Sequence, residues 1–213
     1  MKFLPKLACL ATVLFLHGMA RAQQEAPNNE TYGEAEVIAD AVPPEVVQSA
    51  TKAVATLGNE VVLGRYQTAL ERMNPLWKER ISQRMGGMQA LEEQLAKIPA
   101  EMVRQGITML SSRPEGAPMV HQVGPQKSKS GNLYYTKWLV LVPTITKFRL
   151  IREGNPKPLV IESLGYQVAT SPKDQLDWTF IDGAGLKASD LRGLFITLPR
   201  DIELPPVSKR EAR

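Results

Sequence analysis

Three side chains are the candidates for acid–base chemistry in this chain: His121, Glu162 and Asp182. His121 is the only histidine outside the amino-terminal segment, where His17 lies. A lone histidine forms neither a metal site without carboxylate neighbours nor a catalytic triad without a nucleophile nearby. A general base must also lie within hydrogen-bond reach of its substrate. We therefore expect His121 to be an ordinary residue of a strand or of its rim.

Asp182 has two interpretations that the sequence leaves open. It precedes Gly183, which is typical of a turn residue whose carboxylate accepts hydrogen bonds from local backbone N–H groups. Alternatively, it faces a pocket and acts as a base whose pKa is raised by burial. The turn is the simpler expectation.

Glu162 is the strongest candidate for a functional carboxylate. The alternation of side chains along a strand puts it on the same face as Val160 and Leu164. A carboxylate on an apolar face must be paired, hydrogen-bonded or protonated. Lys147 and Arg149 in the preceding apolar run could pair with it across a turn. We favour this pairing over catalysis.

Aromatic and methionine side chains are the remaining candidates for binding. Tyrosine and tryptophan combine an apolar body with a polar tip, which suits the wall of a ligand cavity. The cavity candidates are Tyr66, Trp77, Trp138 and Tyr166. Met73, Met85, Met88 and Met102 could form an adaptable groove for peptides. Packing in the hydrophobic core is the alternative for both sets.

Motifs that hold cofactors or metals are missing from the sequence. It contains no Gly-rich phosphate loop, no paired cysteine ligands and no Gly-x-Ser-x-Gly nucleophile elbow. We therefore expect no cofactor and no metal.

The amino terminus has the three parts of a secretory signal over residues 1–22. Two lysines precede an apolar run, residues 7–16, that is too short to span a bilayer, and Ala20-Arg21-Ala22 predicts cleavage before Gln23. We expect an exported protein, periplasmic or extracellular; a retained membrane anchor is the alternative. Because Cys9 lies in this segment, the mature chain has no disulfide and depends on its core.

Charge argues against a nucleic-acid partner. Removing the signal lowers the number of basic residues from 26 to 23, against 22 acidic residues, so the net charge falls from +4 to +1. The sequence pI of about 9.2 therefore does not indicate the clustered basic face that binds nucleic acid. The length that is left fits one domain.

Residues 133–183 organise the expected fold, because their β-branched and aromatic runs are broken by turn dipeptides. They predict a strongly curved antiparallel sheet with a turn over residues 153–156. Pro143 cannot donate a ladder hydrogen bond, which predicts a bulge or an edge position. Gly165, in the middle of the next run, predicts a sharp bend.

The remaining segments are predicted to surround this sheet as a single domain over residues 44–198. A polar leader, 23–43, precedes it and an extended basic tail, 199–213, follows it. Within the domain, apolar spacing, prolines and glycines predict helices over 44–63, 66–73, 75–85 and 88–105, the last kinked or split at Pro99. Short strands over 107–112 and 118–123, a loop over 124–132 and a short helix capped by Ser189 or Asp190 complete the list.

Helices followed by a long curved sheet make an α+β arrangement. This order, Gly64-Arg65-Tyr66, the segment 73–77 (MNPLW) and the segment 178–183 (WTFIDG) resemble the nuclear transport factor two-like superfamily, over about residues 44–196. This is the cone fold shared with ketosteroid isomerase and scytalone dehydratase. The resemblance implies amino-terminal helices packed on the concave face of a cone-like sheet, often around a pocket with an aspartate or histidine base. No catalytic position of those enzymes can be matched here, so it implies a fold more than an activity.

The leading functional expectation is an exported, non-enzymatic binding or interaction domain. Its partner is a small molecule or a protein, with a homodimer possible, no nucleic acid and no stable membrane insertion after signal removal. One alternative is a small-molecule isomerase, dehydratase or hydrolase that uses a pocket carboxylate. The other is an envelope chaperone or scaffold that binds peptides.

Overall fold

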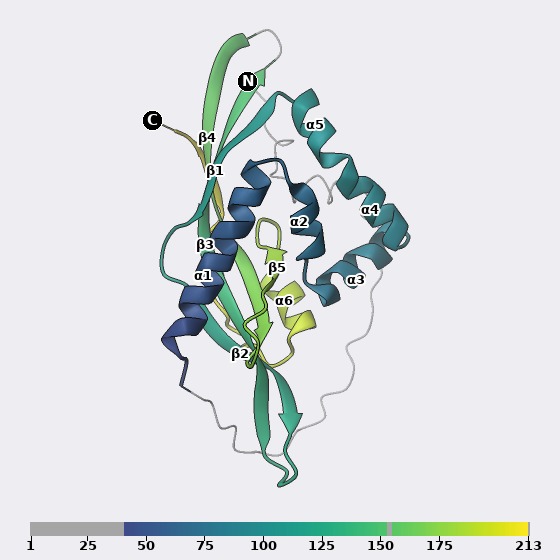
Figure 1. The fold of residues 1–213 in the computed structure, drawn as a ribbon, viewed down its shortest axis with the longest axis vertical. Coiled ribbons are helices and arrows are strands. Elements are labelled where there is room, and N and C mark those ends of the chain that lie inside the picture. The colour runs from purple at the N-terminus through teal and green to yellow at the C-terminus, as the bar shows by residue number, and fades with distance from the viewer. Residues whose placement is uncertain (1–40, 153–154, 213) are drawn as a thin grey trace.

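The computed structural model describes residues 41–152 and 155–212 (Figure 1). The expected signal, nearly all of the expected leader and part of the expected turn at 153–156 lie outside the described residues. The described part is an α+β structure built from helices and an antiparallel sheet. None of its helices combines the length and the apolar character needed to cross a membrane.

The helices that precede the sheet begin and end at local signals in the sequence. They are α1 (Pro44–Val62), α2 (Tyr66–Glu71), α3 (Pro75–Met85), α4 (Met88–Ala96) and α5 (Ile98–Arg104). Pro44 and Pro75 occupy the first helical position, where the missing N–H costs nothing. The Asn74 side chain accepts hydrogen bonds from the Leu76 and Trp77 N–H groups, which caps α3. The predicted split near Pro99 is confirmed by the separate helices α4 and α5.

The sheet of the described residues has six antiparallel strands and is open, with two long strands at its centre. β3 (Leu133–Arg152) pairs along its length with β4 (Asn155–Pro172). β1 (Ile107–Pro114) and β2 (Met119–Lys127) both pair with the other edge of β3. β5 (Thr179–Asp182) and β6 (Ser208–Glu211) both pair with the outer edge of β4, and α6 (Ala188–Leu194) lies between them in the chain. The predicted tail thus contributes a strand to the sheet.

Pro143 corrects one expectation, because it lies in the central strand β3 without a bulge. It is paired with Tyr166 of β4 and the register continues unbroken on both sides. Along the other edge of β3, β1 ends opposite Thr144 and β2 begins opposite Leu141. The Pro143 carbonyl accepts a hydrogen bond of 2.9 Å from the Glu115 N–H, in the connection between these strands. Because the N–H and C=O of a strand residue point to the same side, the missing N–H of Pro143 faces this gap and not β4.

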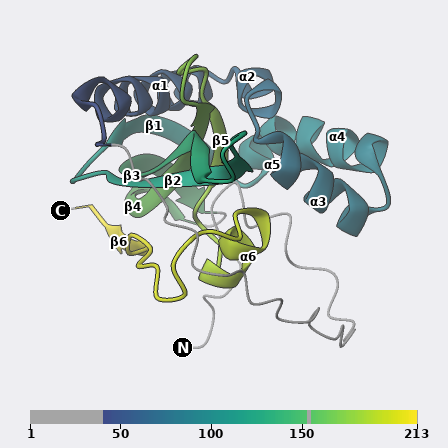
Figure 2. The same cartoon turned by 90° about the horizontal axis from the view of Figure 1, so that it is seen from below.

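The two faces of β3 pack against different layers, which explains why its apolar run is nearly continuous. Trp138, Val140 and Val142 form one buried cluster with the apolar side of α1. Leu139 and Leu141 point to the opposite face, in a cluster that includes α6 and the segment after it. Figure 2 shows α1 on one side of the sheet and α6 on the other. The α3–α5 helices lie to one side of α1 and α2 (Figure 1).

Candidate functional site

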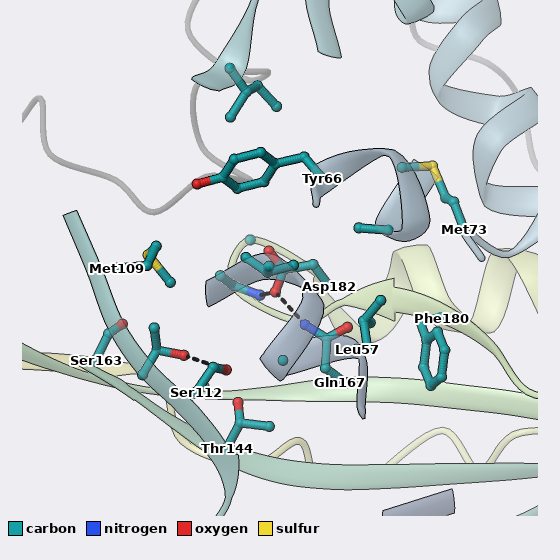
Figure 3. A pocket seen from close by; sticks show the side chains of 18 of the residues that line it. Leu57, Tyr66, Met73, Met109, Ser112, Thr144, Ser163, Gln167, Phe180 and Asp182 are labelled. Atoms are coloured by element: carbon teal, nitrogen blue, oxygen red, sulfur yellow. Dashed lines mark hydrogen bonds between the residues drawn. The ribbon is translucent and has the colours of Figure 1, made fainter. Parts of the chain in front are cut away.

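A cavity of about 290 Å³ lies on the α1 side of the sheet (Figure 3). Its floor consists of side chains that alternate along the two central strands. Thr144, Thr146 and Phe148 come from β3, and Ser163 and Gln167 come from β4. The strand register fixes these residues on one face, because Thr144 pairs with Gly165 and Thr146 with Ser163. A row of polar groups therefore runs along the sheet under the cavity.

Apolar side chains from the helices form the rest of the wall. Leu57 and Val61 of α1 and Ile98 and Met102 of α5 are among them. Tyr66 of α2 donates a hydrogen bond of 3.2 Å from its hydroxyl to the Met102 sulfur, and burial raises the pKa of Tyr66. The helical side of the cavity is thus mostly apolar, and the Tyr66 hydroxyl on it already donates to Met102.

Gly165 keeps the floor of the cavity open. A Cβ placed on this residue would have Thr144 Oγ1 as its nearest neighbour, at 3.9 Å, which is ordinary van der Waals contact. The β3–β4 register shows no shift at this glycine. Gly165 therefore leaves empty the space above the sheet that the side chain of any other residue would fill.

Asp182, at the end of β5, is the acidic group of the cavity floor. Its Oδ1 accepts hydrogen bonds from Gln167 Nε2 at 3.4 Å and from the Ala184 N–H at 3.2 Å. Among the described residues, none donates to its Oδ2. Burial raises the pKa of Asp182, although the Ala184 N–H and the charge of Lys209 act in the opposite direction. The local N–H contact expected of a turn residue is present, and the same carboxylate also lines the cavity. Its action as a base stays a prediction.

Tyr166 lines the cavity next to Asp182, and its ring packs closely on Gly183. A Cβ on Gly183 would lie 2.5 Å from the tyrosine ring, so only glycine fits there. The Tyr166 hydroxyl is buried and has no hydrogen-bond partner among the described residues. Burial and the neighbouring Asp182 raise the pKa of Tyr166 to about 12. The Tyr166 hydroxyl is buried away from the cavity surface, so Asp182 Oδ2 is the polar group here that a ligand could use.

The other aromatic candidates are divided between the cavity and the core. Tyr66, Trp77 and Tyr166 line the cavity, whereas Trp138 is buried beneath α1 and does not. Lys173 Nζ lies 4.4 Å from the centre of the Trp138 ring, within reach of a cation–π contact.

The remaining titratable candidates lie outside the cavity. His121, on β2 opposite Leu139, is half-buried, and burial lowers its pKa. Glu162 pairs with Lys147 at 2.8 Å, which confirms one of the two predicted partners, and with Arg210 at 2.9 Å. Hydrogen bonds from these two cations lower the pKa of Glu162. Its carboxylate is therefore committed to an ion pair on the sheet.

The four methionines that were candidates for a peptide groove lie in different surroundings. Met73 and Met102 line the cavity, Met85 packs against the core around Trp77, and Met88 is exposed. Those on the cavity wall contribute to one space between the helices and the sheet.

Sequence reasoning missed the polar floor of the cavity. Thr144 and Thr146 interrupt the apolar run of β3 at alternate positions, and this spacing already places them on one face of the strand. Gln167 and Ser163 follow the same pattern on β4. Periodic polar residues in the middle of buried strands were the available signal.

The described lining of the cavity carries two carboxyl groups and no side chain of lysine, arginine or histidine. The two carboxyl groups are those of Asp182 and Glu101. No three histidine, cysteine, aspartate or glutamate residues of the described chain are grouped closely enough to hold a metal ion. In comparisons with known proteins, no protein-family model, curated protein or solved structure matches this chain.

Proposed function

We propose that this chain is an exported, cone-like binding domain that encloses a small, mostly apolar molecule. The observation that carries the proposal is the cavity between the helices and the sheet, with apolar walls and a few convergent polar groups. Its volume, about 290 Å³, is at the small end of the range for ligand pockets. The order of helices and strands supports a relationship to the nuclear transport factor two-like superfamily, in which the cone often encloses a pocket.

Gly165 supports this proposal more directly than the volume does. Glycine in the interior of a strand weakens the strand, because it has no side chain to pack against its neighbours. At this position a larger residue would fill the cavity without an initial clash. A glycine that maintains an empty space on a buried sheet face fits a binding function.

Binding of a neutral apolar dye, N-phenylnaphthylamine, tests the proposal. Its fluorescence rises in apolar surroundings, so we expect a saturable increase with one dye bound per chain. The affinity should fall in the order wild type, Gly165→Ala, Gly165→Leu, as the added side chain fills the cavity. Circular dichroism checks that each variant is folded. Equal dye binding by wild type and a folded Gly165→Leu variant would place the ligand elsewhere and overturn the proposal.

A second candidate function is supported by Asp182. Its Oδ2 is free of partners among the described residues, it lines the cavity, and burial raises its pKa, which are the properties of a general base. An isomerase, dehydratase or hydrolase would use this carboxylate rather than Glu162, which is paired with two cations on the face of β4 opposite to Ser163, outside the cavity.

Deuterium exchange distinguishes the enzyme from the binding domain. A base at Asp182 would remove a proton from the carbon next to the carbonyl of a cavity-sized ketone in D₂O and return a deuteron. NMR of the ketone would show exchange that depends on wild-type protein and is lost in Asp182→Asn. If the wild-type protein exchanges the ketone no faster than Asp182→Asn does, the result favours the binding domain.

A further inference from the structure

We infer that the cavity prefers apolar amines, bound as ammonium ions against Asp182, to neutral or anionic molecules of the same shape. This inference rests on the proposed binding function and adds the chemical class of the ligand. It starts from the composition of the wall. The described lining residues include the carboxyl groups of Asp182 and Glu101 but no cationic side chain.

The geometry of Asp182 leaves one carboxylate oxygen for a ligand. Both hydrogen bonds that Asp182 accepts, from Gln167 and Ala184, go to Oδ1. They fix the carboxylate on one side and leave Oδ2 on the cavity without a donor from the described chain. An ammonium group has three donors and a positive charge, so it can donate to Oδ2 and bring a cation into direct contact with the carboxylate.

Aromatic rings from the helical side and from the sheet side of the cavity add to this preference. Phe180 and Tyr66 line the cavity with Asp182 (Figure 3). The faces of such rings attract cations, most strongly where water is excluded. The apolar part of an amine would contact the helical wall, where Leu57 of α1 is one of the contacts.

Glu101 of α5 makes the cavity unfavourable for anions. Hydrogen bonds from Arg104 and Gln105 hold the pKa of Glu101 below its usual range, so this carboxyl stays charged. The Arg104 side chain is 75% exposed, and it offsets part of the charge from outside the cavity, whose lining it does not join. A carboxylate ligand would meet two carboxyl groups and no cationic donor in the described wall. The resulting charge repulsion would disfavour anions and so contribute to specificity.

The charged and titratable groups around Asp182 determine how binding depends on pH. Tyr166 on β4 is neutral near neutral pH, Lys209 on β6 acts through its charge, and Glu101 belongs to the α5 side of the cavity. Where Asp182 is protonated in the empty cavity, binding an ammonium ion releases that proton to solvent and leaves a carboxylate–ammonium pair. Amine affinity should therefore rise with pH through the pKa of Asp182 and fall once the amine itself loses its proton. A neutral ligand that accepts a hydrogen bond from protonated Asp182 would instead lose affinity as the pH rises through the pKa of Asp182.

Three probes with one apolar body and different head groups test the inference: phenylbutylamine, phenylbutanol and phenylbutanoate. Each competes with N-phenylnaphthylamine for the full mature chain, at a series of pH values above the ordinary pKa of an aspartate. We expect the amine to bind about tenfold or more tightly than the alcohol, as a hydrogen bond to a charged partner warrants, and the carboxylate to bind most weakly.

Asp182→Asn assigns the preference to this carboxyl. In the variant, amine and alcohol should bind equally while the alcohol still displaces the dye. Asp174→Asn removes the same charge from an exposed position outside the cavity and should keep the preference. If Asp182→Asn does not fold, the rise of amine affinity with pH in the wild-type chain decides. Equal binding of amine and alcohol by the wild-type chain would overturn the inference and leave the proposed function standing. Failure of the dye and all three probes to bind would overturn both.

Discussion

At the scale of single residues, Gly165 on the cavity floor and Gly183 next to Asp182 have opposite surroundings. A Cβ on Gly165 would have Thr144 Oγ1 as its nearest neighbour, at 3.9 Å, whereas Gly183 is in close contact with the ring of Tyr166. The first determines how much room a ligand has. The second determines where the tyrosine ring, and with it the unpaired hydroxyl next to Asp182, is placed.

Gly183→Ala should destabilise the protein by about 1–3 kcal/mol, the usual cost of overpacking a core. The added Cβ would lie 2.5 Å from the Tyr166 ring, which is buried and has little room to move. Urea titration measures the loss of unfolding free energy. Gly165→Ala is the matched control, because its Cβ has no contact closer than 3.9 Å. Equal stability of the two variants would contradict the close packing of Tyr166 on Gly183.

Asp182 should make the ligand-free protein less stable as the pH rises. Because the pKa of Asp182 is raised in the folded state, the folded protein binds this proton more tightly than the unfolded chain does. The stability that the neutral acid contributes is present below the ordinary pKa of an aspartate and is lost as the pH rises through the raised pKa.

Asp182→Asn should remove this loss, since asparagine keeps an oxygen that can accept from Gln167 and Ala184. Urea titrations of both proteins across this pH range measure the effect. The lowered pKa values of Glu101 and Glu162 act at more acidic pH, where stability is lost as the pH falls, so the two effects are separable. Parallel curves for wild type and variant would show that Asp182 is not buried as a neutral acid.

At the scale of elements, β6 joins a sheet edge that would otherwise be open. Its backbone pairs with residues 161–164 of β4, and its Arg210 completes the ion pair of Glu162 with Lys147. All four residues of β6 are exposed, so backbone hydrogen bonds and this ion pair hold it, with little apolar burial.

Deleting residues 208–213 should leave the fold intact and speed hydrogen exchange of the β4 amides that pair with β6. The pKa of Glu162 should also rise toward its usual value, because Lys147 alone remains as its cation. Heteronuclear NMR measures both changes. Arg210→Gln should raise the pKa of Glu162 but keep the amides protected, since the backbone pairing stays. Unchanged exchange after the deletion would mean that β6 does not hold this edge in solution.

The parts of the fold that local sequence determines were predictable. Pro44, Pro75 and Gly86 mark helix ends by their own backbone geometry, and Gly86 has the positive φ that such an end requires. The pairing of β4 with β6 was not, because it joins segments more than 40 residues apart through exposed side chains without an apolar pattern. Asp182 was left open because its surroundings depend on the β4–β5 register, which places it beside Gln167.

At the scale of the whole molecule, export stays a prediction, because the evidence for it lies in residues 1–22, outside the described part. Cleavage after Ala22 should give a mature chain that begins at Gln23. Intact-mass measurement of the protein recovered from the exporting cell checks this. A mass that includes the first 22 residues would instead indicate an amino-terminal anchor.

The contact between α1 and the end of the sheet has a consequence for biosynthesis. The Trp178 indole N–H donates to the Ser49 hydroxyl at 3.2 Å across 129 positions in the chain. The ribosome makes α1 first, yet the strands that bury its apolar side are made much later. Native contacts of such long sequence separation form slowly, because a large loop must close before they contribute. Until β5 has been synthesised, part of the apolar side of α1 stays exposed. Nascent chains that stop before Thr179 should therefore be the ones that chaperones retain.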